Sequence, residues 1–186
     1  KEPKVSGERQ ERNLAWLLKK WPSGYQTAFR KSVLTDILQQ QYTDYPGFDY
    51  HDVLFGMLAP LYGKVVCLDQ LLDQHRIHQA NVTQSASSLS FNKTRLSRIN
   101  YLQKVISRYE SVKKIAEERQ ISEADHRQVT RALALTNLRL KLLQSRNPFW
   151  ALGLMFQIRE YRTIKDFISD LVYTYSLNGL ARRLLK

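Results

Sequence analysis

Apolar residues along this chain recur every three or four positions, the spacing that places them on one face of an α-helix. The two longest stretches of this kind are residues 92–118 and 122–146, separated by a few polar residues. The apolar arc of the second stretch is wide, which is typical of the central helix of a bundle. We expect these two helices to form an antiparallel hairpin, with the remaining helices packed around it.

Shorter helical patterns precede this hairpin. The apolar spacing predicts helices over residues 9–21 and 25–41, and a third helix from Tyr50. We expect the third helix to break near Ala59, because Pro60 removes a backbone donor and clashes with the preceding turn. Beyond the proline, regularly spaced apolar residues predict a further helical stripe, formed by Leu61, Val65, Leu68 and Leu72.

The last part of the chain predicts one long helix. Asn147 is a favourable N-cap, Pro148 is a favourable first residue, and the helical spacing continues to Asn178 and Gly179. We place the apolar beginning of this helix, residues 149–156, in the core. The positions predicted to face inward farther along are Ile158, Tyr161, Ile164, Ile168, Leu171 and Tyr175.

These patterns predict an all-α fold, a single-domain bundle of about six helices over residues 9–186. A flexible segment is expected at residues 1–8, and a long polar loop near residues 79–90, where almost no apolar residue occurs. Ser122 and Asp125 have the spacing of a capping box, which predicts the start of the second hairpin helix. No stretch shows the alternation typical of a β-strand.

The net charge is the feature of the composition that bears on function. With 43% hydrophobic and 25% charged residues the chain is an ordinary globular protein, but its formal charge is +12. Residues 91–146 hold 13 basic and 5 acidic residues, so +8 of that excess falls in less than a third of the chain. A surplus this local is typical of a face that attracts polyanions, whether nucleic acid, anionic lipid or an acidic protein.

The predicted hairpin is the candidate for that face. If its helices are antiparallel, cations at the end of one lie beside cations at the start of the other and can contact several phosphates. The competing interpretation is a solvated face whose cations pair with carboxylates, as Glu110 would with Lys113. No helix-turn-helix signature predicts sequence specificity. The candidate nucleic-acid-binding residues, for DNA or RNA, are Lys104, Arg108, Lys113, Lys114, Arg119, Arg127 and Arg131.

Aromatic residues form a second candidate surface, around a turn predicted at Pro46 and Gly47. They either plug the end of the bundle or dock a protein partner, because tyrosine is enriched at interface hot spots. The alternative function is therefore a helical adaptor or assembly domain of a larger complex that docks an acidic protein. Peripheral membrane attachment is less favoured, because no helix clearly combines a basic face with a large exposed apolar one. The candidate partner-binding residues are Tyr42, Tyr45, Phe48 and Tyr50.

No catalytic or metal-binding motif stands out. His75 and His78 could share one helical face and Asp69 and Asp73 another, but the two pairs do not meet. No glycine-rich phosphate loop occurs, and Cys67 has no neighbouring group that would activate it. The sequence therefore predicts a non-enzymatic module without a metal or other cofactor.

The remaining expectations concern location. A single cysteine rules out an intrachain disulfide and fits a reducing compartment. The polar, charged first residues do not resemble a signal peptide. The longest apolar run is far shorter than the ~20 residues of a membrane span. We therefore expect a cytoplasmic protein, whose oligomeric state the sequence does not predict.

Overall fold

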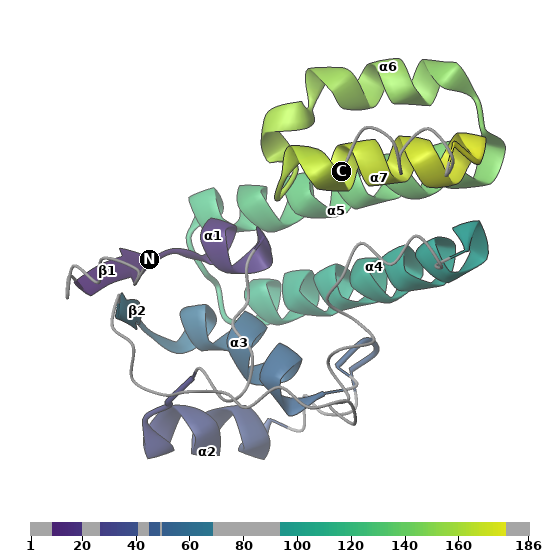
Figure 1. Ribbon diagram of the computed structural model, residues 1–186. Helices are drawn as coiled ribbons and strands as arrows, with labels where there is room; N and C mark the ends of the chain where they lie inside the picture. Colours follow the sequence, from purple (N-terminus) through teal and green to yellow (C-terminus); the bar gives the residue numbers. More distant parts are fainter. Residues whose placement is uncertain (1–8, 20–26, 41–44, 49, 69–93, 178–186) are drawn as a thin grey trace, which may run out of the picture.

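A long antiparallel hairpin lies at the centre of the molecule (Figure 1). The computed structural model describes residues 9–19, 27–40, 45–48, 50–68 and 94–177. Helices α4 (Arg95–Glu118) and α5 (Glu123–Ser145) run side by side in opposite directions. Shorter elements pack against both, so the all-α bundle is confirmed. In chain order they are β1 (Arg9–Arg12), α1 (Leu14–Lys19), α2 (Lys31–Gln39), α3 (His51–Tyr62), β2 (Val65–Leu68), α6 (Pro148–Phe156), the 3-10 helix η4 (Ile158–Glu160) and α7 (Ile164–Tyr175).

Side-chain caps fix the bounds of the hairpin helices. Thr94 begins α4 by accepting a hydrogen bond from the backbone N–H of Ser97 at 3.1 Å. Gln120 has a φ of 51° in the turn between the helices. Ser122 then accepts from the backbone N–H of Asp125 at 3.1 Å, so the predicted capping box is confirmed. The sequence thus determines where the chain reverses.

The core lies on two sides of the hairpin. On one side Met57 and Leu58 of α3 pack with α4 and α5, and all of their surface is buried. On the other side α6 and α7 close over α5, with Leu142 and Leu154 completely buried between them. Because α5 contributes to both sides, its wide apolar arc is explained.

A two-stranded ribbon at one end of the molecule was not predicted. β1 pairs with β2 in antiparallel register, with Arg9 opposite Leu68 and Arg12 opposite Val65. The helix predicted from residue 9 therefore begins only at Leu14, and the helical stripe predicted through Val65 and Leu68 is wrong. Adjacent β-branched residues after the end of α3 favour the extended chain over another helical turn.

Two predictions about the shorter helices are also wrong in their bounds. α3 does not break near Ala59 but continues through Pro60 to Tyr62. The proline lies in the last turn, where only one backbone bond is lost, and the buried residues before it hold the helix in place. α2 is shorter than the helix predicted over 25–41, and the residues just before it are not helical.

The helix predicted to continue from Pro148 is divided. Asn147 caps α6 as expected, accepting from the backbone N–H of Phe149 at 3.0 Å. α6 nevertheless ends at Phe156, and Thr163 caps a new helix by accepting from the backbone N–H of Asp166 at 3.2 Å. This break changes the face of α7 that points inward. Ile164 is exposed, and the buried positions are instead Phe167, Ser169, Asp170, Val172, Tyr173 and Thr174.

The prediction that residues 149–156 lie in the core is wrong for most of them. Leu154 is completely buried against α5, whereas Phe149 is 77% and Phe156 is 84% exposed. Helix α6 is the outermost layer over α5 (Figure 1), so only one of its faces meets the core.

Several expectations lie outside the described residues. These are the flexible segment at 1–8, the polar loop near 79–90, the four metal candidates between Asp69 and His78, and the helix end at Asn178 and Gly179.

Candidate polyanion-binding surface

The turn of the hairpin brings the end of α4 beside the start of α5, as the sequence predicted (Figure 1). Carboxylates lie among the cations there. The Lys113 ammonium is 3.9 Å from Glu117, and the Arg127 guanidinium is 3.2 Å from Glu123. Both are contacts four residues apart on one helix. Two of the candidate cations are therefore paired with acids.

Two other candidates at this end lie over aromatic rings. The Lys114 ammonium is 5.0 Å from the ring centre of Tyr45. The Arg119 guanidinium is 3.6 Å from the ring centre of Tyr62, and its Nε donates to the Leu61 carbonyl at 3.3 Å. These cation–π contacts hold α4 against the segments before it. Both side chains remain exposed while making them.

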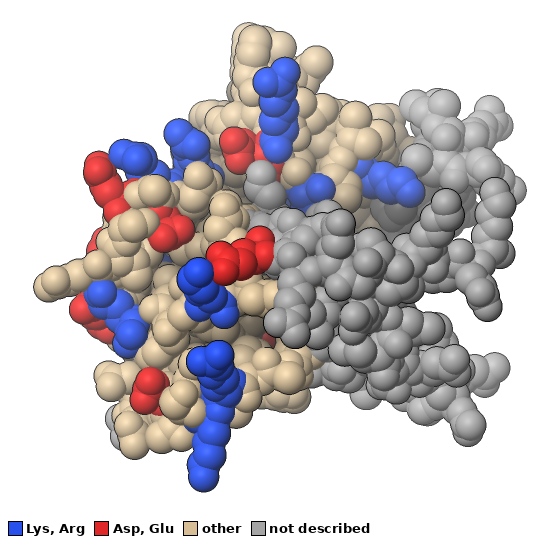
Figure 2. Space-filling view, turned by 90° about the vertical axis from the view of Figure 1, so that its left-hand side faces the viewer, with Lys and Arg blue, Asp and Glu red and all other residues tan. Residues whose placement is uncertain are grey.

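The turn end of the hairpin has no net charge. Residues 110–131 contain five basic and five acidic residues. Figure 2 shows the side of the molecule on which this turn lies, and there cations and carboxylates are interspersed rather than gathered by sign. The candidates of this region, Arg131 included, are thus brought to one end of the hairpin together with an equal number of acids.

Arg108 has a different position from the other candidates. Only 7% of it is exposed, and its Nε donates a hydrogen bond of 2.7 Å to the carbonyl oxygen of Gly47. One turn later on α4, the Ser111 hydroxyl donates to the carbonyl of Pro46 at 3.0 Å. Arg108 therefore holds the 45–48 turn against α4 and does not reach the surface.

The excess charge of the hairpin lies entirely at the opposite end, which we call the open end: residues 94–109 of α4 and its cap, and residues 132–146 of α5. Residues 91–109 contain five basic residues and no acidic residue, and residues 132–146 contain three basic residues and no acidic residue. Among the described members of this group, Lys104, Lys141 and Arg146 are exposed. Counting charge over the whole hairpin had concealed this difference between its ends.

Arg95 joins the two helices at the open end. Its Nε donates to the carbonyl of Leu143 at 2.5 Å and its Nη2 to the carbonyl of Gln144 at 2.8 Å. A guanidinium is favourable there because the last carbonyls of α5 lack helical partners and carry the negative end of the helix dipole. Arg146 follows directly, as the exposed C-cap of α5 with a φ of 55°.

A buried ion cluster lies beneath this surface. Asp170 is completely buried and accepts hydrogen bonds from Arg98 Nε at 2.9 Å, Arg139 Nε at 2.6 Å and the Tyr161 hydroxyl at 3.2 Å. Burial alone would lower the pKa of Arg139, but the Asp170 carboxylate more than offsets this and raises that pKa. Burial and then Asp170 raise the pKa of Tyr161. The cluster joins α4, α5 and α7.

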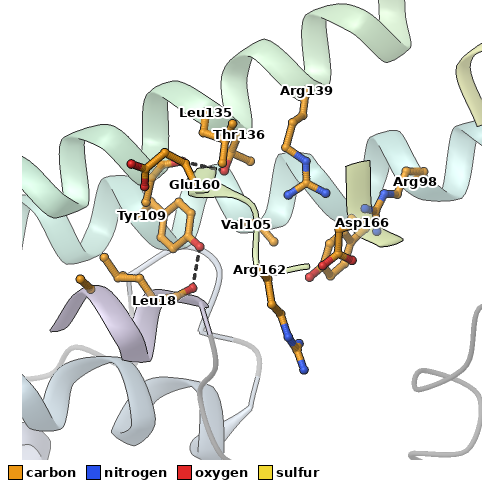
Figure 3. Close-up of a pocket in the computed structure, with 13 residues that line it drawn as sticks. Leu18, Arg98, Val105, Tyr109, Leu135, Thr136, Arg139, Glu160, Arg162 and Asp166 are labelled. Atoms are coloured by element: carbon orange, nitrogen blue, oxygen red, sulfur yellow. Dashed lines mark hydrogen bonds between the residues drawn. The ribbon is translucent and has the colours of Figure 1, made fainter. Parts of the chain in front are cut away.

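A cavity of about 90 Å³ adjoins this cluster, between α1, the hairpin and the segment before α7 (Figure 3). Three cationic side chains line it, those of Arg98, Arg139 and Arg162, and two carboxylates, those of Glu160 and Asp166. Figure 3 shows Arg162 pointing away from the hairpin, so its charge is not directed into the cavity. With Asp170 alongside, cations and carboxylates balance. The arrangement stabilises helix packing and is not a cationic pocket for an anion.

The aromatic candidates do not form one exposed patch. Phe48 is buried in the core, and the Tyr45 hydroxyl donates to Glu118 at 3.0 Å. Tyr50 is 62% exposed, and Tyr42 lies outside the described residues. Tyr45 and Phe48 therefore close the end of the bundle, one of the two interpretations that the sequence left open.

Asp170 is the residue of this region that the sequence analysis missed. The available signal was its place three residues after Phe167 and four before Thr174, a spacing that puts an acid on the buried face of a helix. Within the described part of the chain, no three His, Cys, Asp or Glu side chains are grouped so that they could hold a metal ion. None of the described helices is both long and apolar enough to cross a bilayer.

Comparison with known proteins finds no match to this chain among protein-family models, curated proteins or solved structures.

Proposed function

We propose that this chain is a non-enzymatic helical module that binds nucleic acid, DNA or RNA without sequence specificity, through the open end of the α4–α5 hairpin. One observation carries the proposal. Residues 91–109 and 132–146 together contain eight basic residues and no acidic residue, whereas the turn end is neutral. A polyanion is therefore attracted to one end of the hairpin.

The exposed cations there suit phosphate contacts. Lys104, Lys141 and Arg146 are all exposed, and Arg95 and Arg98 add positive charge at partly buried positions nearby. Such contacts gain affinity largely from the release of counterions and do not depend on base identity. The proposed binding is thus strongly salt-dependent and tolerant of sequence.

The alternative, an adaptor that docks an acidic protein through the aromatic turn, has less support. Phe48 is buried, and the ring and hydroxyl of Tyr45 are engaged by Lys114 and Glu118. An interface hot spot needs aromatic side chains that a partner can cover.

The decisive experiment compares the two ends of the hairpin. One variant carries Lys104→Glu, Lys141→Glu and Arg146→Glu, and a matched variant carries Lys114→Glu, Arg127→Glu and Arg131→Glu. Both change the net charge by the same amount, so a difference between them reports position. Fluorescence anisotropy with labelled duplex and single-stranded DNA and RNA measures affinity at low salt and at about 200 mM salt.

The open-end variant is expected to lose roughly tenfold or more in affinity at low salt, with a shallower salt dependence, by about 0.9 in slope per lost phosphate contact on duplex DNA. The turn-end variant is expected to lose less. No binding by the wild-type protein at low salt would reject the proposal. A larger loss in the turn-end variant would reject the assigned surface.

A further inference from the structure

Helix α6 exposes an apolar face with no partner within the described part of the molecule. Five of the eleven large apolar side chains that the described residues expose lie between residues 149 and 164. Their concentration on one short segment separates them from scattered surface residues, which need no explanation. They are Phe149 at 77%, Leu152 at 51%, Met155 at 56%, Phe156 at 84% and Ile164 at 62% exposure.

The exposed side chains follow one stripe of the helix. Phe149, Leu152 and Phe156 are separated by three and four residues, the spacing of neighbours on a helical face. The opposite face holds Leu154, completely buried against α5. Helix α6 is thus a ridge at the outer edge of the bundle (Figure 1), and no polar side chain occurs in it from Pro148 to Phe156.

Cations lie at both ends of this ridge. From residue 126 to residue 159 the chain contains six basic residues and no acidic residue. Arg146 precedes α6, and Arg159, Arg162 and Lys165 follow it, all of them exposed. Glu160 and Asp166, the nearest acids after the ridge, are half-buried at the cavity beside the ion cluster. The exposed charge around the apolar stripe is therefore positive.

This charge argues against a second copy of the chain as the occupant. Two α6 ridges packed antiparallel would place Arg146 of one copy close to Arg159 of the other, and each chain carries a formal charge of +12. Like charges brought together without carboxylates cost free energy. The covering surface must be anionic where it meets the ends of the ridge.

The composition of the ridge also argues against a specific protein groove. Protein interfaces normally carry about one hydrogen bond per 100–200 Å². The side chains that α6 exposes are hydrocarbon or thioether, and its backbone groups are used within the helix. Hydrocarbon requires no hydrogen bonds from a helix inserted beside it.

We propose that α6 docks on the surface of an anionic lipid bilayer, with Phe149 and Phe156 inserted among the lipid chains. The helix has 9 residues and would lie along the membrane plane, with Arg146, Arg159 and Lys165 against acidic headgroups. A large apolar face combined with a basic surround is the feature that the sequence analysis did not find, because it placed these residues in the core. The proposal is independent of nucleic-acid binding.

The test is sedimentation of the purified chain with vesicles of phosphatidylcholine alone and of a two-to-one mixture of phosphatidylcholine and phosphatidylserine. We expect pelleting with the anionic vesicles, weaker pelleting at high salt, and little with the zwitterionic ones. The variant Phe149→Ser with Phe156→Ser is expected to weaken partition by roughly tenfold for each phenylalanine. Its affinity for nucleic acid should stay at the wild-type value, which separates this proposal from the previous one.

A matched control is Leu38→Ser with Tyr50→Ser, which removes two exposed apolar side chains at 54% and 62% exposure. Helix α2, which carries Leu38, lies at the edge of the molecule opposite α6 (Figure 1). This variant should pellet like the wild type.

Four results would overturn the proposal. The first is no pelleting with anionic vesicles at low salt, and the second is pelleting that both serine variants reduce equally. The third is pelleting that survives loss of both phenylalanines, since binding would then be electrostatic only. The fourth is a concentration-dependent dimer abolished by Phe149→Ser with Phe156→Ser, in a chain that does not bind vesicles. If that variant fails to fold, the lipid and salt dependence of the wild-type protein still decides.

Discussion

Arg108 donates a hydrogen bond of 2.7 Å from its Nε to the carbonyl oxygen of Gly47, 61 residues earlier in the chain. The turn approaches α4 so closely that a Cβ at position 47 would lie 2.8 Å from the backbone nitrogen of Arg108. The φ of Gly47 is +92°, a conformation that other residues rarely adopt. A residue that resembles a phosphate ligand in the sequence is thus a structural contact of a glycine turn.

Replacing Gly47 with alanine is expected to destabilise the protein by at least about 2 kcal/mol, because the backbone of α4 cannot move away and the φ is strained. Chemical denaturation measures the change. Gly63→Ala is the control, since its φ is 171° and no atom lies within 4 Å of the added Cβ. That substitution should change stability by less than about 0.5 kcal/mol. Equal effects at the two glycines would contradict the close approach.

Asp170→Asn is expected to destabilise the protein by roughly 3–5 kcal/mol, because two guanidiniums would remain in the interior without their carboxylate. The side chains of Arg98 and Arg139 are only 16% and 14% exposed, so water cannot replace the acid. Thermal or urea unfolding gives the value. Asp166→Asn is the comparison, because Asp166 is only half-buried and its side chain accepts from Thr163; about 1 kcal/mol is expected there. A loss below about 1 kcal/mol at position 170 would show that the cluster does not hold the helices together.

Much of the hairpin could be predicted because local chemistry determines it. Ser122 with Asp125, and Asn147 with Pro148, mark helix starts through side-chain caps that act within a few residues. Thr163 and Asp166 have the same spacing as the first pair. That signal was overlooked because the apolar spacing seemed to continue across it, and the inward face of α7 was then assigned incorrectly.

The candidate surface could be predicted less well, because exposure depends on distant contacts. The sequence pattern of Arg108 does not reveal that a turn 61 residues away covers it. Nor does helical spacing distinguish Phe156 from Leu154, since a wholly apolar segment fits a buried helix and an exposed ridge equally well. Only the placement of α6 at the edge of the bundle separates them.

The stability of the protein is expected to fall as the pH rises above about 10, the pKa of tyrosine in an unfolded chain. Burial, with a smaller contribution from Tyr101, raises the pKa of Tyr109, whose hydroxyl donates to the carbonyl of Leu18 at 2.9 Å. Below pH 10 the group is protonated in both states. Above it only the unfolded state releases the proton, so stability falls by up to about 1.4 kcal/mol per pH unit.

Tyr109→Phe isolates this contribution. At neutral pH the variant should be less stable by about 1 kcal/mol, the value of one hydrogen bond. Above about pH 10 the difference should shrink and then reverse, because phenylalanine has no proton to release. Urea denaturation between pH 7 and about 11.5 measures it. A constant difference across that range would contradict the assignment.

Two residues of α6 provide the last prediction. Leu154 is completely buried and Phe156 is 84% exposed, although only one residue separates them in an apolar helix. Leu154→Ala is therefore expected to cost roughly 2–5 kcal/mol, through lost burial and a cavity beside α5. Phe156→Ala should change stability by less than about 0.5 kcal/mol. Urea denaturation of the two variants compares them directly. Because the proposed bilayer contact requires an outward Phe156, a large loss on its replacement would place it in the core and remove the apolar ridge.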